Sequence, residues 1–286
     1  MLDAIFLRAK KTRASLRWLL LAAAWVSVIG GDSLWAAPPA CASQCTIYFY
    51  NPETNINNYV SLKASFDTYL SQFGEGYRFQ PFDEKDIFES VIGSDENSIF
   101  LISSWHYRLL KHKYPLHPML VGVSGGVASQ KKILSASQKI TDLEHLRGKN
   151  IAVAGSKAYS KNVLEQIFAG KPPDLLESLR LILVPKDIDA LMAVGYGMAA
   201  AALTTEKSLD DLRAINRKQY DLLEPLGASR ASLLTLVVTP HQRTPAVDAL
   251  LDVVDRMQGA SGDTLHMLGL DGWKRLTASE QQVLEQ

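Results

Sequence analysis

Short apolar runs alternate with amphipathic stretches along most of this 286-residue chain. Residues 46–50 form an apolar run typical of a buried strand, and aromatic and leucine side chains recur behind it at helical spacing up to Phe73. Two more strand and helix pairs are expected, with their strands at 77–82 and 98–102. Such alternation is the pattern of a mostly parallel sheet covered by helices. The sequence therefore predicts an α/β fold.

The alternation breaks once and then resumes. Two extended runs within 118–135 flank Gly125-Gly126 and predict a hairpin. Thr141 and Glu144 then form a capping-box pattern at the start of a helix. A strand is expected at 150–154, a helix capped by Ser160 behind it, a late strand at 233–239 and helices from Pro245 onward. Two α/β series predict two lobes, 46–136 plus 228–286 and 137–227, with C-terminal helices.

The first forty residues have the features of an export signal. Five basic and two acidic side chains accompany an uncharged apolar run at 18–29 and a small-residue segment. Twelve residues suit a secretory signal better than a membrane span of about 20 residues. An uncleaved N-terminal anchor is the alternative. We expect residues 1–40 to direct the protein to the periplasm.

Cys41 and Cys45 are the only cysteines of the chain. Export would place them in an oxidising compartment, where a small-loop disulfide between them is feasible. Cys41 could instead carry a lipid anchor or be removed with the signal.

Charge composition argues against a nucleic-acid partner. Thirty basic side chains balance thirty acidic ones, and without the first forty residues the remainder is 25 against 28. No whole-molecule positive field is left to attract a phosphate backbone. We expect a monomer that binds a small molecule.

Four segments together resemble a known family. They are Tyr50-Asn-Pro-Glu53, Leu101-Ile-Ser-Ser-Trp-His-Tyr107, Thr141-Asp-Leu-Glu-His-Leu-Arg-Gly-Lys-Asn-Ile-Ala-Val153 and Asp189-Ala-Leu-Met-Ala-Val-Gly-Tyr-Gly-Met-Ala-Ala200. Their order is similar to that of phosphonate/phosphate-type solute-binding proteins of ABC importers. The resemblance implies the two-lobed type II periplasmic binding fold, hinge closure on a ligand, and an inner-membrane ABC permease or a membrane sensor as partner.

Ligands of open parallel sheets bind outside the carboxyl ends of the strands. The loops after Tyr50, Ile102, Ala154 and Leu203 should lie there. Besides the candidate contacts named below, these loops carry Asn51, Glu53 and Thr205. They should therefore meet around one ligand.

The predicted oxyanion site is the helix start at residues 156–160. Free amides and hydroxyls there suit an oxyanion, and Lys157 adds a positive charge. Ser103-Ser104 supply a second hydroxyl cluster from the other lobe. Alternatively, these serines cap helices and Lys157 is solvated. The candidate ligand contacts are Tyr50, Ser103, Ser104, His106, Tyr107, Ser156, Lys157, Tyr159, Ser160, Tyr196 and Thr204.

Aromatic residues outnumber charged ones among these candidates, which keeps a second ligand class open. Sites for lipids or sterols are mostly apolar with few polar anchors. A binding protein for a hydrophobic or amphipathic ligand is therefore the main alternative to an oxyanion-binding protein.

Patterns for catalysis are weak. Ser124 lies in a G-x-S-x-G sequence, but the run behind it has no helical face, as a nucleophile elbow requires. Gly195 and Gly197 imitate a dinucleotide fingerprint but follow a helix. His106, His112 and His117 share no helical face. We expect no enzyme activity, no cofactor and no metal.

Overall fold

The computed structural model describes residues 44–54, 58–258 and 262–285. The predicted export signal and Cys41 lie outside this part of the chain. Cys45 is described and carries no free thiol. No helix in the described part is both long and apolar enough to cross a membrane.

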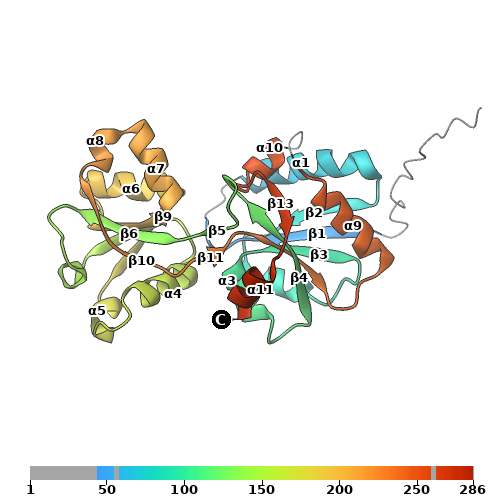
Figure 1. The fold of residues 1–286 in the computed structure, drawn as a ribbon, viewed down its shortest axis with the longest axis horizontal. Helices are drawn as coiled ribbons and strands as arrows, with labels where there is room; N and C mark the ends of the chain where they lie inside the picture. Colours follow the sequence, from blue (N-terminus) through green and yellow to red (C-terminus); the bar gives the residue numbers. More distant parts are fainter. Residues whose placement is uncertain (1–43, 55–57, 259–261, 286) are drawn as a thin grey trace, which may run out of the picture. The chain divides into compact units, whose positions relative to one another are not determined.

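A six-stranded sheet forms the first structural layer, in the order β13-β4-β12-β3-β1-β2 (Figure 1). Its strands β1, β2 and β3 are parallel, whereas β12 and β13 run antiparallel to β4. The bounds are β1 (Cys45–Tyr50), β2 (Tyr77–Pro81), β3 (Ser98–Ile102), β4 (Leu116–Val123), β12 (Leu236–Pro240) and β13 (Gly272–Arg275).

Alternating side chains bury both faces of this sheet. Ile47 and Phe49 of β1 join a core with the helices on one face, while Tyr50 joins a different core on the other. The first face carries α1 (Tyr59–Leu70), α9 (Pro245–Asp255) and α10 (Gly262–His266), and the second α2 (Lys85–Val91), α3 (Ser104–Leu110) and α11 (Ala278–Glu285). A short 3-10 helix, Ser71–Phe73, follows α1.

A five-stranded sheet is built from the middle of the chain, in the order β10-β6-β9-β7-β8. Strands β7, β8 and β9 are parallel, and β6 runs antiparallel to β9 and β10. The bounds are β6 (Lys132–Ser137), β7 (Asn150–Val153), β8 (Arg180–Leu183), β9 (Ala201–Thr205) and β10 (Leu223–Ala228).

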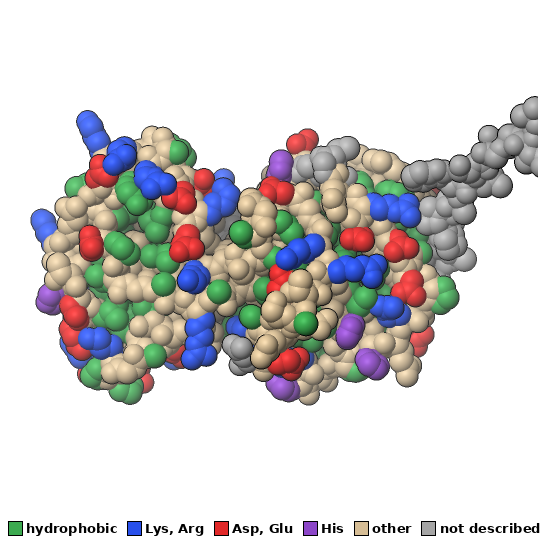
Figure 2. Space-filling model, in the orientation of Figure 1, with side chains coloured by type: hydrophobic (Ala, Val, Ile, Leu, Met, Phe, Trp, Pro, Cys, Tyr) green, Lys and Arg blue, Asp and Glu red, His purple; other side chains and the backbone are tan. Residues whose placement is uncertain are grey.

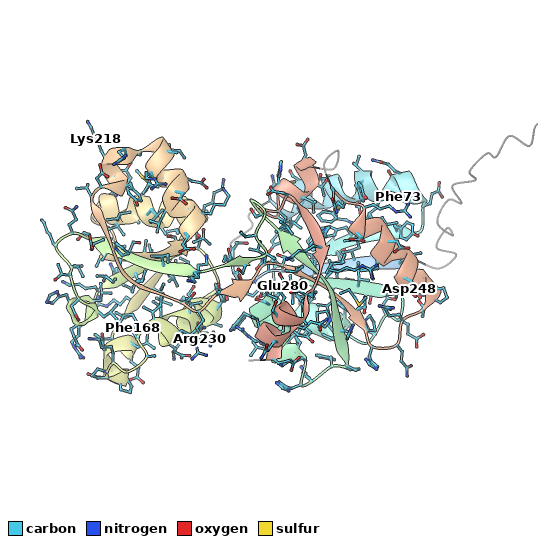
Figure 3. The ribbon with its side chains drawn as sticks, viewed as in Figure 1. Phe73, Phe168, Lys218, Arg230, Asp248 and Glu280 are labelled. Atoms are coloured by element: carbon cyan, nitrogen blue, oxygen red, sulfur yellow. The ribbon has the colours of Figure 1, made fainter. Side chains whose placement is uncertain are left out.

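Helices also cover both faces of the second sheet. A cluster that includes Val153, Leu164 and Phe168 lies on one face, and a cluster around Leu191 lies on the other. Of these residues, Phe168 is labelled in Figure 3. The helices of the first face are α4 (Lys157–Ile167) and α5 (Pro173–Glu177), and those of the second are α6 (Asp187–Gly195) and α7 (Glu206–Ile215), with α8 (Arg217–Tyr220) behind α7.

The chain passes between the two sheets at residues 124–131 and 229–235. Within these stretches, β5 (Ser129–Gln130) and β11 (Ser232–Leu233) pair antiparallel as a small ribbon. The predicted α/β architecture with two sheets is therefore present.

Three local predictions were wrong. The turn at Gly125-Gly126 exists, with a bridge between Ser124 and Val127, but the runs beside it do not form a hairpin because β4 and β6 join different sheets. Asp142, not Thr141, caps the short 3-10 helix Leu143–Leu146. Helix α4 begins one turn earlier than predicted, with Ser156 as its cap. The sequence also did not predict β13.

Candidate functional site

One cavity of about 920 Å³ collects the loops at the carboxyl ends of four parallel strands. Asn51, Glu53 and Thr54 follow β1, Ala154 follows β7, and residues 185–187 follow β8. Residues 205–208 lie at the end of β9 and the start of α7. Asn58, Asp210 and residues within 124–132, 234–235 and 266–270 complete the described lining. This placement agrees with the rule that ligands bind outside the carboxyl ends of parallel strands.

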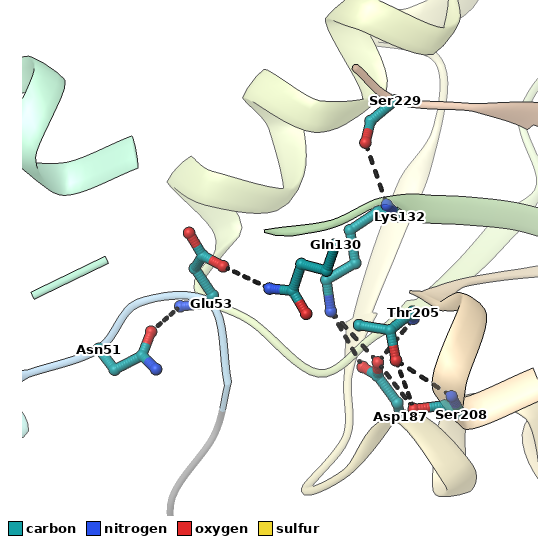
Figure 4. A network of polar contacts seen from close by, with 8 residues as sticks. All are labelled: Asn51, Glu53, Gln130, Lys132, Asp187, Thr205, Ser208 and Ser229. Atoms are coloured by element: carbon teal, nitrogen blue, oxygen red, sulfur yellow. Dashed lines mark hydrogen bonds and ion pairs between the residues drawn. The ribbon is translucent and has the colours of Figure 1, made fainter. Parts of the chain in front are cut away.

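A network around Asp187 forms the polar wall of this cavity (Figure 4). Its carboxylate accepts the Thr205 N–H at 2.8 Å and the Ser208 hydroxyl at 3.3 Å. The Lys132 ammonium lies 3.2 Å from the same oxygen, with both side chains largely buried. The Lys132 backbone N–H donates to Ser229 Oγ at 3.0 Å. Asp187 thus engages the donors at the start of α7 and neutralises Lys132.

Glu53 is a second buried carboxylate in the lining, only 4% exposed. Its Oε2 accepts from the Gln130 amide at 3.0 Å, whereas Oε1 makes no regular hydrogen bond with a described residue. Burial raises the pKa of Glu53, while the Lys132 charge, Gln130 and the nearby hydroxyls of Ser103 and Tyr159 act in the opposite direction. Burial, then the Glu53 charge, raises the pKa of Tyr159 well above its usual range.

The start of α4 contacts the loop that follows β1. The Ser156 N–H donates to the Pro52 carbonyl at 2.8 Å, and Ser156 Oγ accepts the Tyr159 N–H at 3.3 Å. A Cβ at Gly155 would lie 3.0 Å from the backbone carbonyl oxygen of Pro52 and 3.1 Å from that of Glu53. Only glycine therefore permits this close approach. The Ser160 N–H also donates to the Ser156 carbonyl, so three amides of the predicted oxyanion site are already engaged.

Several other predicted contacts have structural roles. Ser103 caps α3 by accepting the His106 N–H, and Ser104 Oγ donates to the Leu233 carbonyl at 2.8 Å. His106 Nε2 lies 3.0 Å from Glu89 Oε1, and burial lowers the pKa of His106. These observations match the alternative in which the serines cap helices.

The remaining predicted contacts divide by burial. Tyr50 and Tyr107 belong to the core of the first sheet, and Ser160 is buried. Thr204 is buried with no partner for its Oγ1 among the described residues. Lys157 and Tyr196 are exposed.

None of the eleven predicted contacts is among the described residues that line the cavity, although Asn51 beside Tyr50, Ala154 near Ser156 and Thr205 beside Thr204 are. Asn51, Glu53 and Thr205 were named from their loops, but Lys132 and Asp187 were missed. Asp187 had a usable signal because it follows the apolar run of β8, which is visible in the sequence. Lys132 had none, since it lies within an extended run like any other strand residue.

Ser124 lines the cavity but does not lie in a nucleophile elbow. Its N–H donates to the Val127 carbonyl in a tight turn, and no helix follows.

The described residues hold no cluster of three or more metal-ligating side chains. Positive and negative side chains are interspersed over the face shown in Figure 2.

Solved structures with a similar fold are mainly binding proteins. XAC2383 from Xanthomonas citri bound to chloride ion is 14% identical, with a TM-score of 0.62 over 85% of this chain and 95% of that chain. A binding protein component of an ABC phosphonate transporter from Pseudomonas aeruginosa is 13% identical, with a TM-score of 0.61 over 85% and 86%. PhnD1 from Prochlorococcus marinus in complex with methylphosphonate is 11% identical, with a TM-score of 0.61 over 85% and 96%.

These identities show a shared fold and leave the ligand open. No protein-family model and no curated protein sequence matches the chain. The predicted two-lobed fold of type II periplasmic binding proteins is confirmed.

Proposed function

We propose that this chain is a periplasmic solute-binding protein of an ABC-type importer, which captures a small phosphate- or phosphonate-like oxyanion without altering it chemically. The observation that carries the proposal is the cavity of about 920 Å³ at the carboxyl ends of β1, β7, β8 and β9. Similar structures include a phosphonate transporter component and a methylphosphonate complex. Delivery to an inner-membrane permease follows from this role, and a membrane sensor is the alternative recipient.

Donors for an oxyanion are available on the polar wall. Thr205 and Ser208 lie at the start of α7, where backbone amides carry partial positive charge. The Thr205 N–H now donates to Asp187, and the Ser208 N–H donates to Thr205 Oγ1. Lys132 lies beside them, and Lys131 and Lys207 also line the cavity. An incoming oxyanion can take over donors that Asp187 now occupies.

The serines predicted from the sequence define a second possible set of contacts. For an oxyanion to reach the start of α4, the Pro52 carbonyl has to leave the Ser156 N–H. Ser160 and Ser104 are buried, and the Ser104 hydroxyl bonds to the Leu233 carbonyl. The two sets give different predictions for the same binding experiment.

Isothermal titration of the purified protein with phosphate, phosphite and methylphosphonate tests the proposal. We expect one anion to bind, and Thr205→Ala with Ser208→Ala to weaken it by roughly tenfold or more, because hydrogen bonds to charged groups contribute about 1.5–3 kcal/mol. Ser90→Ala is the matched control, since this exposed hydroxyl only bonds to the Ile87 carbonyl in α2.

Ser156→Ala with Ser160→Ala separates the two sets of contacts. A loss of affinity in this pair alone would place the oxyanion at the start of α4. Absence of binding by all three anions at millimolar concentration would contradict the proposed function.

A further inference from the structure

The cavity has a second wall of different chemistry. Opposite in character to Asp187 and its partners, this apolar wall consists of Val127, Leu234, Met267, Leu268 and Leu270. These residues come from the crossover behind β4, from the segment between β11 and β12, and from the segment behind α10. The lining therefore combines one polar and one apolar surface.

The apolar wall is backed by the core of the first sheet. Leu270 is buried in that core, and Leu234 and Leu268 pack against it. A Cβ at Gly122 would lie 2.7 Å from both methyl carbons of Leu270, so the glycine lets this side chain pack directly on β4. The wall is thus a preformed surface.

Two apolar side chains of this wall remain accessible. Val127 is 58% exposed and Met267 is 37% exposed. Exposed apolar residues are common singly, but these two line the same cavity as the leucines. A ligand that covered them would gain free energy by removing apolar surface from water.

Size and charge both argue against a bare inorganic anion as the only occupant. Cavities of about 300–1,000 Å³ hold drug-sized ligands, and this one, of about 920 Å³, is near the upper limit. Lys132 is neutralised by Asp187, and Glu53 adds no positive charge in either protonation state. The buried wall therefore has no excess positive charge for a dianion. In the rest of the described lining, the exposed Lys131, Lys186 and Lys207 are accompanied by Glu206 and Asp210, so affinity has to come partly from another source.

We propose that the ligand is an amphipathic anion, with one acidic head group on the polar wall and an apolar chain of several carbons along the apolar wall. This inference rests on the proposed function and specifies the ligand class of the same cavity. The head group uses the donors beside Asp187, and the chain covers Val127 and Met267. The apolar wall then selects for chain length.

A series of linear alkylphosphonates from methyl to hexyl tests this inference by isothermal titration. Each methylene that reaches the apolar wall should raise the association constant about fourfold, from roughly 0.8 kcal/mol per buried CH₂. Val127→Ser with Met267→Ser should flatten this dependence, because it lowers the affinity for hexylphosphonate far more than the affinity for methylphosphonate. Both side chains are exposed, so the variant should fold, which circular dichroism verifies.

Val60→Ser with Met198→Ser is the matched control. It removes the same two side-chain types from exposed positions outside the described lining, and the chain-length dependence should persist. Equal affinity along the whole series would overturn the amphipathic ligand while leaving oxyanion binding intact. If no alkylphosphonate of any length bound, the proposed function would fail together with this inference.

Discussion

At the scale of single residues, Glu53 is the most unusual side chain of the site. It is buried, lines the cavity and has a raised pKa because burial disfavours its charged form. Its folded-state pKa therefore lies above that of the unfolded chain. The stabilising contribution of this group is fully present below the unfolded pKa and is lost as pH rises through the folded pKa.

Glu53→Gln should remove this loss. The glutamine keeps an acceptor for the Gln130 amide but carries no charge. We expect the variant to have a higher free energy of unfolding than the parent at pH 7.5, with the difference shrinking toward pH 4.5. Urea denaturation at several pH values measures it. A constant difference across that range would contradict a titrating Glu53.

The sequence indicated the loops of the site better than the side chains within them. The carboxyl ends of β1, β7 and β9 were predicted, and Glu53 and Thr205 lie in those loops. The strand-end rule does not tell which hydroxyl faces a ligand and which caps a helix. Ser156 and Ser160 could each cap α4, and the choice of Ser156 depends on the approach of Pro52 to Gly155, which is a tertiary contact.

At the scale of secondary-structure elements, the sequence alone did not predict which strands pair with one another, because that depends on tertiary contacts. The turn at Gly125-Gly126 was recognisable from its glycines, but β6 pairs with β9 and β10 because its apolar side chains join the second core. Strand β13 has the sequence Gly-Trp-Lys-Arg, which is neither an apolar run nor an alternation with a period of two. Longer parallel strands were predicted well because they are nearly continuous apolar runs.

Gly122 of β4 contacts Leu270, which lines the cavity. In Gly122→Ala, the added methyl would displace the Leu270 side chain from its position on β4. We expect a loss of stability of about 1–3 kcal/mol from overpacking, together with weaker binding of long-chain ligands. Denaturation and titration with hexylphosphonate measure the two effects.

Gly272→Ala in the neighbouring strand β13 is the matched control for Gly122→Ala. A Cβ there would make only ordinary contact with Gln258, at 3.6 Å. It should change stability and binding far less. Similar effects of both substitutions would show that the Leu270 contact is not the cause.

At the scale of the whole molecule, each sheet with its helices is a candidate lobe. Because β6 at Lys132–Ser137 pairs within the second sheet, we propose that the lobe boundaries lie in the β5–β11 ribbon instead of at 136 and 228. The ribbon takes one strand from each of the two chain crossings, as a hinge requires. Ligand contacts from both lobes would favour a closed population.

Hinge closure predicts a smaller radius of gyration when ligand is bound. Small-angle X-ray scattering of the purified protein with and without a saturating ligand measures this change. A ligand that contacts both walls has a higher affinity for the closed state and shifts the population toward it. An unchanged radius at a concentration where titration shows full occupancy would argue for a rigid site.

The order of the strands along the chain also has a consequence for how the protein folds during synthesis. All strands of the second sheet lie within 132–228, so that unit can assemble from one contiguous segment. The first sheet needs β12 beside β3 and β13 beside β4, and its early strands must wait until residue 275 has emerged. The segment synthesised first is therefore completed last, and it is the part of the nascent polypeptide that most needs protection from aggregation.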